Sequence, residues 1–161
     1  MKKILFLVSK DKGSKIIQYA KDYSKHFRIV IMTKKVTYSD LSSFDNIFSF
    51  CYRHIIEKDI IAKLKNPIIN LHISYLPFNR GAHPNFWAFI DNTINGISIH
   101  EMDKGIDTGN IIIQKQIDFQ LLSNKNKLTF KNTYELLIEN IETLFVENFI
   151  KILNKDYKTN Q

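Results

Sequence analysis

The sequence predicts an α/β fold, in which helices flank an open, mostly parallel β-sheet. Two observations carry this prediction. Through roughly the first sixty residues, short apolar runs alternate with segments of helical period, a pattern typical of parallel strands joined by helices. The chain also has 161 residues, of which 44% are hydrophobic and 24% charged, as expected of a single soluble domain with one core.

Four apolar runs in the first half of the chain are typical of buried strands, at residues 4–8, 27–32, 45–51 and 68–72. Two segments between them have the spacing of amphipathic helices, at residues 14–24 and from about 55 to 64. The first of these helices should turn Ile16, Ile17 and Ala20 inward. The second should end before Pro67, because the residue that precedes a proline disfavours the helical conformation.

The second half of the chain is expected to add one short helix, two strands and one long helix. The short helix is predicted at residues 85–92, and the strands at residues 96–101 and 111–119. The long helix at residues 133–153 should pack on the sheet through one apolar face. That face comprises Leu136, Leu137, Ile141, Leu144, Phe145, Phe149 and Ile152. Only the polar stretch 123–127 has the composition of a linker.

Residue types that suit a binding site concentrate between residues 70 and 110. This segment contains four of the five glycines, two of the three prolines and three of the five histidines. Ordered loops on a rigid scaffold are where functional residues gather. We therefore expect the active site in the middle of the chain.

Asn70 and His72 lie two residues apart at the end of the fourth apolar run, so both side chains should project from the same face of a strand. Open α/β sheets bind ligands at strand ends, and the loop that follows is stiffened by Pro77 and turned by Gly81. A lone histidine in a strand is often a hydrogen-bonded structural residue. Residue chemistry alone leaves both the structural and the catalytic interpretation of His72 open.

A second polar cluster, at residues 100–109, separates the two strands predicted in the second half of the chain. Its glycines permit close approach of the backbone to a ligand. Asp103 is expected to cap a turn. Asp107 lies between apolar Ile106 and a Thr-Gly turn, where it could be partly buried and orient a histidine.

Two other kinds of chemistry are disfavoured. The set His72, His83, His100 and Asp107 has the side chains of zinc or iron ligands, but its spacing matches no recognised zinc pattern, so no metal site is expected. Cys51 is the only cysteine and cannot form an intramolecular disulfide. Its apolar neighbours indicate a small buried hydrophobe rather than a nucleophile.

Residues 70–77 read Asn-x-His-x-Ser-x-Leu-Pro with Gly81 after them, and residues 96–109 run from Gly-Ile-Ser-Ile-His to Ile-Asp-Thr-Gly with Gln114 after them. The two segments resemble those of the formyltetrahydrofolate-dependent formyltransferases, a family that includes glycinamide ribonucleotide, methionyl-tRNA and sugar-nucleotide N-formyltransferases. The resemblance extends over roughly residues 45 to 120. It implies a Rossmann-like formyltransferase fold, shortened by about one βα unit because the segment between residues 32 and 45 is short.

The resemblance implies transfer of a formyl group from the co-substrate 10-formyltetrahydrofolate to a primary amine, with Asn70, His72 and Asp107 as catalytic residues. Attack by the amine builds negative charge on the formyl oxygen, which Asn70 and protonated His72 would stabilise. His72 would also move the proton, and Asp107 would orient the imidazole. The folate pocket is expected from the backbone of Tyr52, Arg53, His54, Ile55, Ile56, Met102, Asp103, Lys104, Gly105 and Ile106. Contacts with the amine substrate are expected from Ser74, Arg80, Gly81 and His83.

The identity of the amine is less constrained. The turn of Gly13 and Ser14 is similar to the phosphate-binding turn of the glycinamide ribonucleotide enzymes, although Ser14 also suits a helix cap. We expect residues 1–161 to form one catalytic domain without the carboxy-terminal domain that grips tRNA. The segment from Tyr75 to Trp87 looks more like the sugar-nucleotide enzymes, so a nucleotide-linked amino sugar is the expected acceptor. Purine synthesis and a folate-binding protein without catalysis are the alternatives.

The charge of the chain fits an anionic ligand. Its 23 Lys and Arg residues outnumber its 16 Asp and Glu residues and give a net charge of +7. The lysines are spread without the basic block of a nucleic-acid arm, so no nucleic-acid partner is expected. No apolar run reaches the roughly 18 residues of a membrane span, so we expect a cytoplasmic protein with no membrane partner. A homodimer is a possible assembly.

Overall fold

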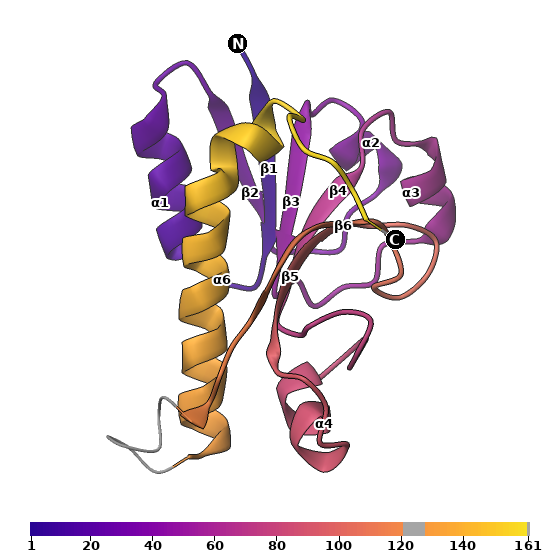
Figure 1. Ribbon diagram of the computed structural model, residues 1–161. Helices are drawn as coiled ribbons and strands as arrows, with labels where there is room; N and C mark the ends of the chain where they lie inside the picture. The colour runs from indigo at the N-terminus through magenta and orange to yellow at the C-terminus, as the bar shows by residue number, and fades with distance from the viewer. Residues whose placement is uncertain (121–127, 161) are drawn as a thin grey trace.

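The computed structural model describes residues 1–120 and 128–160, which form one six-stranded sheet with helices on both faces (Figure 1). The strand order is β2-β1-β3-β4-β5-β6. The strands are β1 (Lys3–Val8), β2 (Arg28–Met32), β3 (Asn46–Phe50), β4 (Ile68–His72), β5 (Gly96–Glu101) and β6 (Ile111–Gln116). The first four strands pair in parallel, whereas β5 is antiparallel to both β4 and β6. The predicted fold class is confirmed.

The helices are α1 (Ser14–Tyr23), α2 (Tyr38–Leu41), α3 (Lys58–Lys63), α4 (Pro84–Ile90) and α6 (Phe130–Leu153). Helices α1 and α6 lie side by side on one face of the sheet, and α2 and α3 lie on the other (Figure 1). Helix α4 contacts α6 at the end of the sheet where β1, β3 and β4 finish. None of the helices in the described ranges combines the length and apolarity that a bilayer span requires.

The larger core lies between the sheet and helices α1 and α6. Phe6 and Phe48 point from the sheet onto Phe145 and Phe149 of α6, and all four rings are fully buried. The ring centroids of Phe48 and Phe145 are 5.0 Å apart at an interplanar angle of 78°, a favourable edge-to-face contact. The predicted apolar face of the long helix is therefore confirmed, with Leu136 only partly buried at its margin.

A smaller apolar cluster covers the opposite face. It comprises Leu5, Leu7, Val36, Leu41, Ile47, Ile56 and Ile68. Between β2 and β3 the only regular element is the four-residue helix α2, which the sequence analysis did not predict. Thr37 begins α2 with a capping box, in which its side chain accepts from the amide of Asp40 and the Asp40 carboxylate accepts from the amide of Thr37.

Three element boundaries lie three residues from their predicted positions. Helix α6 begins at Phe130 rather than at residue 133, because the Thr129 side chain caps it by accepting from the Asn132 amide. Helix α3 begins at Lys58 rather than near residue 55, because Glu57 is extended at its N-cap and the Ile55 side chain is 85% exposed. Strand β6 ends at Gln116 rather than at residue 119, although Ile117 and Phe119 continue into the core and the Ile117 amide donates to the Asn95 carbonyl at 3.0 Å. The polar stretch 123–127 lies outside the described residues.

Candidate active site

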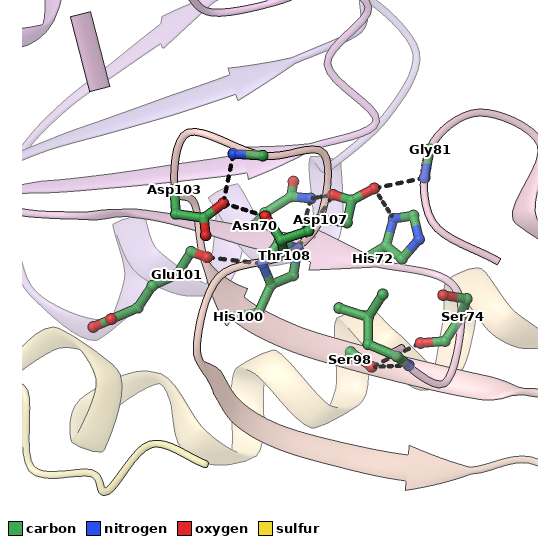
Figure 2. Close-up of polar contacts among 12 residues, drawn as sticks. Asn70, His72, Ser74, Gly81, Ser98, His100, Glu101, Asp103, Asp107 and Thr108 are labelled. Carbon is green, nitrogen blue, oxygen red and sulfur yellow. Dashed lines mark hydrogen bonds and ion pairs between the residues drawn. The ribbon is translucent and has the colours of Figure 1, made fainter. Parts of the chain in front are cut away.

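The pairing of β4 with β5 brings four polar side chains onto one face of the sheet. Asn70 lies opposite His100, and His72 lies opposite Ser98. Because side chains alternate along a strand, all four project to the face that carries α2 and α3. Asp107 reaches this cluster from the loop between β5 and β6 (Figure 2).

The Asp107 carboxylate is the centre of the cluster. Its Oδ1 accepts from Asn70 Nδ2 at 3.2 Å and lies 3.4 Å from His100 Nε2. Its Oδ2 accepts from the Gly81 amide at 2.9 Å and lies 3.6 Å from His72 Nδ1 (Figure 2). The side chain is 12% exposed, and its backbone φ of 50° lies in the left-handed region. The fold therefore holds one carboxylate against four nitrogen atoms from three segments.

These contacts keep Asp107 ionised. Burial alone would raise the pKa of its carboxyl group, but its neighbours outweigh burial and lower the pKa to about 2. They are His100, which can donate to Oδ1 when its Nε2 carries a proton, the charge of protonated His72, and the Gly81 amide. The carboxylate is thus negatively charged throughout the physiological pH range. It can stabilise positive charge on a neighbouring imidazole.

His72 is buried with both ring nitrogens facing oxygen atoms. Its Nε2 lies 3.2 Å from the carbonyl of Asn79, which can only accept, so Nε2 carries a proton. Burial lowers the pKa of His72, against the opposing effects of Asp107 and the Asn79 carbonyl, so the neutral ring prevails near pH 7. Its Nδ1 then holds a lone pair toward Asp107, and a proton taken up there would complete an ion pair.

Asn70 and His100 hold the other carboxylate oxygen. His100 is fully buried, and its Nδ1 donates to the Glu101 carbonyl at 2.9 Å, which leaves the Nε2 lone pair to accept from Asn70 Nδ2 at 3.2 Å. Both amide hydrogens of Asn70 are therefore directed within the cluster, one to His100 and one to Asp107. To donate to a substrate oxygen, Asn70 must release one of these two bonds.

His100 was predicted in the polar cluster at residues 100–109 and weighed as a metal ligand, but not as a partner of Asn70 and Asp107. The available signal was its spacing from Ser98, which places both side chains on one face of a strand. The antiparallel pairing that brings this face beside Asn70 has no signature in the sequence. Among the described residues, no group of three or more His, Cys, Asp and Glu side chains is arranged to hold a metal ion.

The loop that carries Asp107 is shaped by its own polar contacts. Asp103 Oδ1 accepts from the Gly105 amide at 2.9 Å and from Thr108 Oγ1 at 2.6 Å, so Asp103 caps the turn as predicted. A Cβ atom at Gly109 would lie 1.9 Å from the Glu101 carbonyl oxygen. Only glycine fits there, and this close approach returns the loop to β6.

The loop after β4 is fixed by a buried hydroxyl on β5. Ser98 Oγ donates to the Ser74 carbonyl at 2.7 Å and accepts from the Leu76 amide at 3.1 Å. Gln114 Nε2 donates to Ser98 Oγ at 3.1 Å and to the Leu76 carbonyl at 2.6 Å. The loop thus presents the Asn79 carbonyl to His72 from a fixed position.

A cavity of about 1170 Å³ opens in front of the cluster. Its walls include Asn70, His72 and Asp107 together with residues 52–56 and 102–106, which were predicted to form the folate pocket. Of the residues predicted to contact the amine, Gly81 and His83 also line it. Ser74 and Arg80 do not; Ser74 is buried and donates to the Phe78 carbonyl at 2.8 Å.

A further wall of the cavity was not predicted. It is lined by Lys12, Cys51, Phe86, Phe130, Lys131 and Tyr134. Cys51 packs against the core and also faces the cavity, where burial raises the pKa of its thiol despite a hydrogen bond with Tyr134. That direction is opposite to the one that activates a cysteine nucleophile.

Comparison with known proteins identifies the family. A family model described as formyl transferase matches residues 33–135. A methionyl-tRNA formyltransferase of Thermodesulfovibrio yellowstonii is 39% identical over 97 residues, which are 58% of this chain and 32% of that protein. The chain thus spans about a third of the length of this relative.

Two solved structures superpose on nearly all of this chain. The formyltransferase PseJ of Anoxybacillus kamchatkensis, in complex with UDP-4,6-dideoxy-4-formamido-L-AltNAc and tetrahydrofolate, is 34% identical, with a TM-score of 0.86 over 98% of this chain and 80% of that chain. An N-formyltransferase of Helicobacter canadensis, in complex with folinic acid and dTDP-3-aminofucose, is 20% identical, with a TM-score of 0.83 over 100% of this chain and 67% of that chain. The chain therefore belongs to the formyl transferase family.

Proposed function

We propose that this chain transfers a formyl group from 10-formyltetrahydrofolate to the amino group of a nucleotide-linked sugar. The observation that carries the proposal is the cluster of Asn70, His72 and Asp107 on the wall of the large cavity, in a member of the formyl transferase family. At about 1170 Å³ the cavity exceeds the roughly 300–1,000 Å³ of a site for one small ligand. Two substrates that react with each other need such a space.

The cluster supplies the groups that this reaction needs. Attack of an amine on the formyl carbon places negative charge on the formyl oxygen, and the Asn70 amide can donate to it once it releases His100 or Asp107. The amine loses a proton and the folate nitrogen gains one. Neutral His72 can take up that proton at Nδ1, because ionised Asp107 lies 3.6 Å away and stabilises the imidazolium.

The donor side of the cavity suits a flat heteroaromatic ligand. Ile55 and Ile106, one on each predicted folate segment, are 85% and 68% exposed. Exposed apolar side chains that flank a cavity are typical of a wall that a ligand covers. The first segment is held from behind, since Tyr52 Oη donates to the Lys34 carbonyl at 2.5 Å and His54 Nε2 lies 3.2 Å from the Thr33 carbonyl.

The acceptor is inferred from the relatives. PseJ, which is 34% identical, was solved with a formamido sugar linked to UDP. A methionyl-tRNA formyltransferase is also similar, but only over 32% of its own length. A phosphoribosylglycinamide formyltransferase of Anaplasma phagocytophilum is 16% identical to this chain, and this similarity reflects the fold alone.

A substrate panel tests the proposal. The purified chain is incubated with 10-formyltetrahydrofolate and a set of UDP- and dTDP-linked amino sugars, and chromatography with mass spectrometry measures tetrahydrofolate and the sugar product. We expect both to appear in equal amounts, with the sugar heavier by one formyl group. Glycinamide ribonucleotide and methionyl-tRNA serve as competing acceptors.

The other outcomes separate the alternatives. Turnover with glycinamide ribonucleotide and with no sugar would move the chain to purine synthesis. Calorimetric binding of tetrahydrofolate without turnover of any amine would indicate a folate-binding protein. Stoichiometric zinc or iron in the active protein, measured by elemental analysis, would contradict a mechanism that rests on Asn70, His72 and Asp107 alone.

A further inference from the structure

The cavity continues beyond the catalytic cluster to a wall that neither the chemistry nor the donor uses. We call it the α4/α6 wall, and its residues are Lys12, Phe86, Phe130, Lys131 and Tyr134. Phe86 lies on α4, whereas Phe130, Lys131 and Tyr134 lie on the first turns of α6. Helix α4 and the first turns of α6 lie at the end of the sheet where β4 finishes (Figure 1), and Asn70 and His72 are at that end of β4.

Two aromatic rings form the apolar part of this wall. The ring centroids of Phe86 and Phe130 are 5.8 Å apart, with planes tilted by 36°. Their side chains are 44% and 51% exposed, so ring surface remains open. Phe89 supports Phe130 from behind at 4.9 Å, edge to face. Open, supported rings beside a cavity are suited to stacking with a planar heterocycle.

A buried asparagine fixes the two rings relative to each other. Asn85 is 7% exposed, and its Nδ2 donates to the Phe130 carbonyl at 3.2 Å and to Thr133 Oγ1 at 3.1 Å. It thereby ties the start of α4 to the first turn of α6. Helix α4 also follows closely on Gly81, whose amide binds Asp107. The rings are therefore held at a fixed position relative to the catalytic cluster before any ligand binds.

The charge of this wall is positive. The acidic residues among those described around the cavity, Asp103 and Asp107, both belong to the loop between β5 and β6. Lys12 lies over the Tyr134 ring with Nζ 5.0 Å from its centroid. Lys131 is 81% exposed and 3.9 Å from Glu135, a long and solvated pair that competes weakly with a ligand.

We propose that the α4/α6 wall binds the nucleoside diphosphate of the acceptor substrate, with the base stacked on Phe86 and Phe130 and the phosphates neutralised by Lys12 and Lys131. This inference rests on the proposed function and names how the acceptor is held. Stacking accepts any planar base, because every base has a π face. Uracil and thymine nucleotides should therefore bind with similar affinity, and specificity should reside in the sugar.

Binding of nucleotides without turnover tests the inference. Calorimetry with UDP, dTDP, inorganic pyrophosphate and tetrahydrofolate compares the wild-type chain with Phe86→Leu, Phe130→Leu, Lys12→Gln and Lys131→Gln. We expect each leucine variant to bind UDP and dTDP at least about fivefold more weakly than the wild type, since leucine keeps apolar volume but lacks a π face. The leucine variants should bind pyrophosphate with the affinity of the wild type. The glutamine variants should bind pyrophosphate more weakly, and their affinity should depend less on salt concentration.

Matched controls use residues outside the cavity. Tyr38→Leu on α2 changes a ring that is 44% exposed, and Lys65→Gln changes an exposed cation after α3. Both controls should bind nucleotide as the wild type does, and every variant should bind tetrahydrofolate within about twofold of wild type. Circular dichroism checks that the variants remain folded.

Three results would overturn the inference. UDP affinity that is unchanged in both leucine variants would exclude stacking on this wall. Formyl transfer to an amine without any binding of UDP or dTDP would overturn this inference and leave formyl transfer intact, whereas nucleotide binding without transfer would contradict the proposed function alone. A dimer that Phe130→Leu dissociates in sedimentation, without change in UDP affinity, would assign the rings to a second copy of the chain.

Discussion

At the scale of single residues, the candidate site depends on one carboxylate. Asp107 receives hydrogen bonds from Asn70 and Gly81 and lies within 3.6 Å of His72 and 3.4 Å of His100. Removing its charge while keeping its shape separates catalysis from binding. The backbone walls of the proposed donor pocket do not require the charge.

We therefore predict that Asp107→Asn lowers kcat by about 10²–10⁴-fold, because His72 loses the charge that stabilises its protonated form. Tetrahydrofolate should bind within about threefold of wild type, because the backbone walls remain. Steady-state kinetics and calorimetry measure the two quantities. Asp59→Asn, an exposed carboxylate in the first turn of α3, is the control and should be silent. A kcat of Asp107→Asn equal to that of wild type would exclude Asp107 from the mechanism.

The same groups make stability depend on pH. Both Asp107 and His72 have pKa values below those of the unfolded chain, so the unfolded chain binds more protons in acid and stability rises with pH. The contribution of His72 is present above pH 6.5 and is lost below it. That of Asp107, whose pKa falls from 3.8 to about 2, amounts to roughly 2 kcal/mol above pH 3.8 and is lost as the pH falls toward 2.

Urea unfolding across this pH range measures both steps. We expect the free energy of unfolding of wild type to fall below pH 6.5 and again below pH 3.8. His72→Gln should lack the first step, and Asp107→Asn should lack about 2 kcal/mol of the second. An Asp107→Asn protein that loses as much stability as wild type below pH 3.8 would contradict the lowered pKa of Asp107.

At this scale the sequence predicted which residues form the site better than it predicted their contacts. Asn70, His72 and Asp107 were predicted as one constellation, and the structure brings them together. The partnership of Asn70 with His100 was missed, because it depends on the antiparallel register between β4 and β5. A period of two shows which residues share a face of one strand and not which strand lies beside it.

At the scale of elements, the loop between β4 and α4 is positioned from β5. The Ser98 hydroxyl is fully buried and makes three hydrogen bonds, to the Ser74 carbonyl, the Leu76 amide and the Gln114 side chain. Farther along, this loop carries the Asn79 carbonyl that accepts from His72. A substitution at Ser98 should therefore affect both the stability of the fold and catalysis.

We predict that Ser98→Ala lowers the free energy of unfolding by about 1–3 kcal/mol, because the Leu76 amide and the Gln114 side chain lose a buried partner. It should also lower kcat more than it raises KM, since the part of the loop that Ser98 holds places the Asn79 carbonyl against His72. Chemical denaturation and steady-state kinetics measure these effects. Ser43→Ala, at an exposed position after α2, is the control. Wild-type stability in Ser98→Ala would show that the network does not hold the loop.

Periodicity was sufficient for the long elements and insufficient for the short ones. The apolar faces of α1 and α6 follow from spacing, and both were predicted with their buried residues. Helix α2 has four residues and depends on the capping box at Thr37, which a search for long apolar patterns passes over. Strand β6 stops at Gln116 although apolar residues continue to Phe119, because burial persists where ladder pairing has ended.

At the scale of the whole molecule, the site lies between segments that are distant in sequence. The walls proposed for the donor come from residues 52–56, after β3, and 102–106, after β5, while the α4/α6 wall also includes Lys12 near the amino terminus. The net charge of +7 favoured an anionic ligand but gave no location for it. Only the folded chain assembles these walls, so a ligand that bridges them stabilises the native state alone.

We predict that tetrahydrofolate raises the thermal midpoint of unfolding. At 100 times its dissociation constant a ligand adds about 2.7 kcal/mol, which corresponds to about 5–10 °C for a chain of this size. UDP should raise the midpoint through the α4/α6 wall, and the two shifts should add, because the sites proposed for the two ligands lie in different parts of the cavity. Differential scanning calorimetry with each ligand and with both measures the shifts. Phe130→Leu should reduce the UDP shift only, whereas a combined shift no larger than that of tetrahydrofolate alone would mean that the two ligands compete for one site.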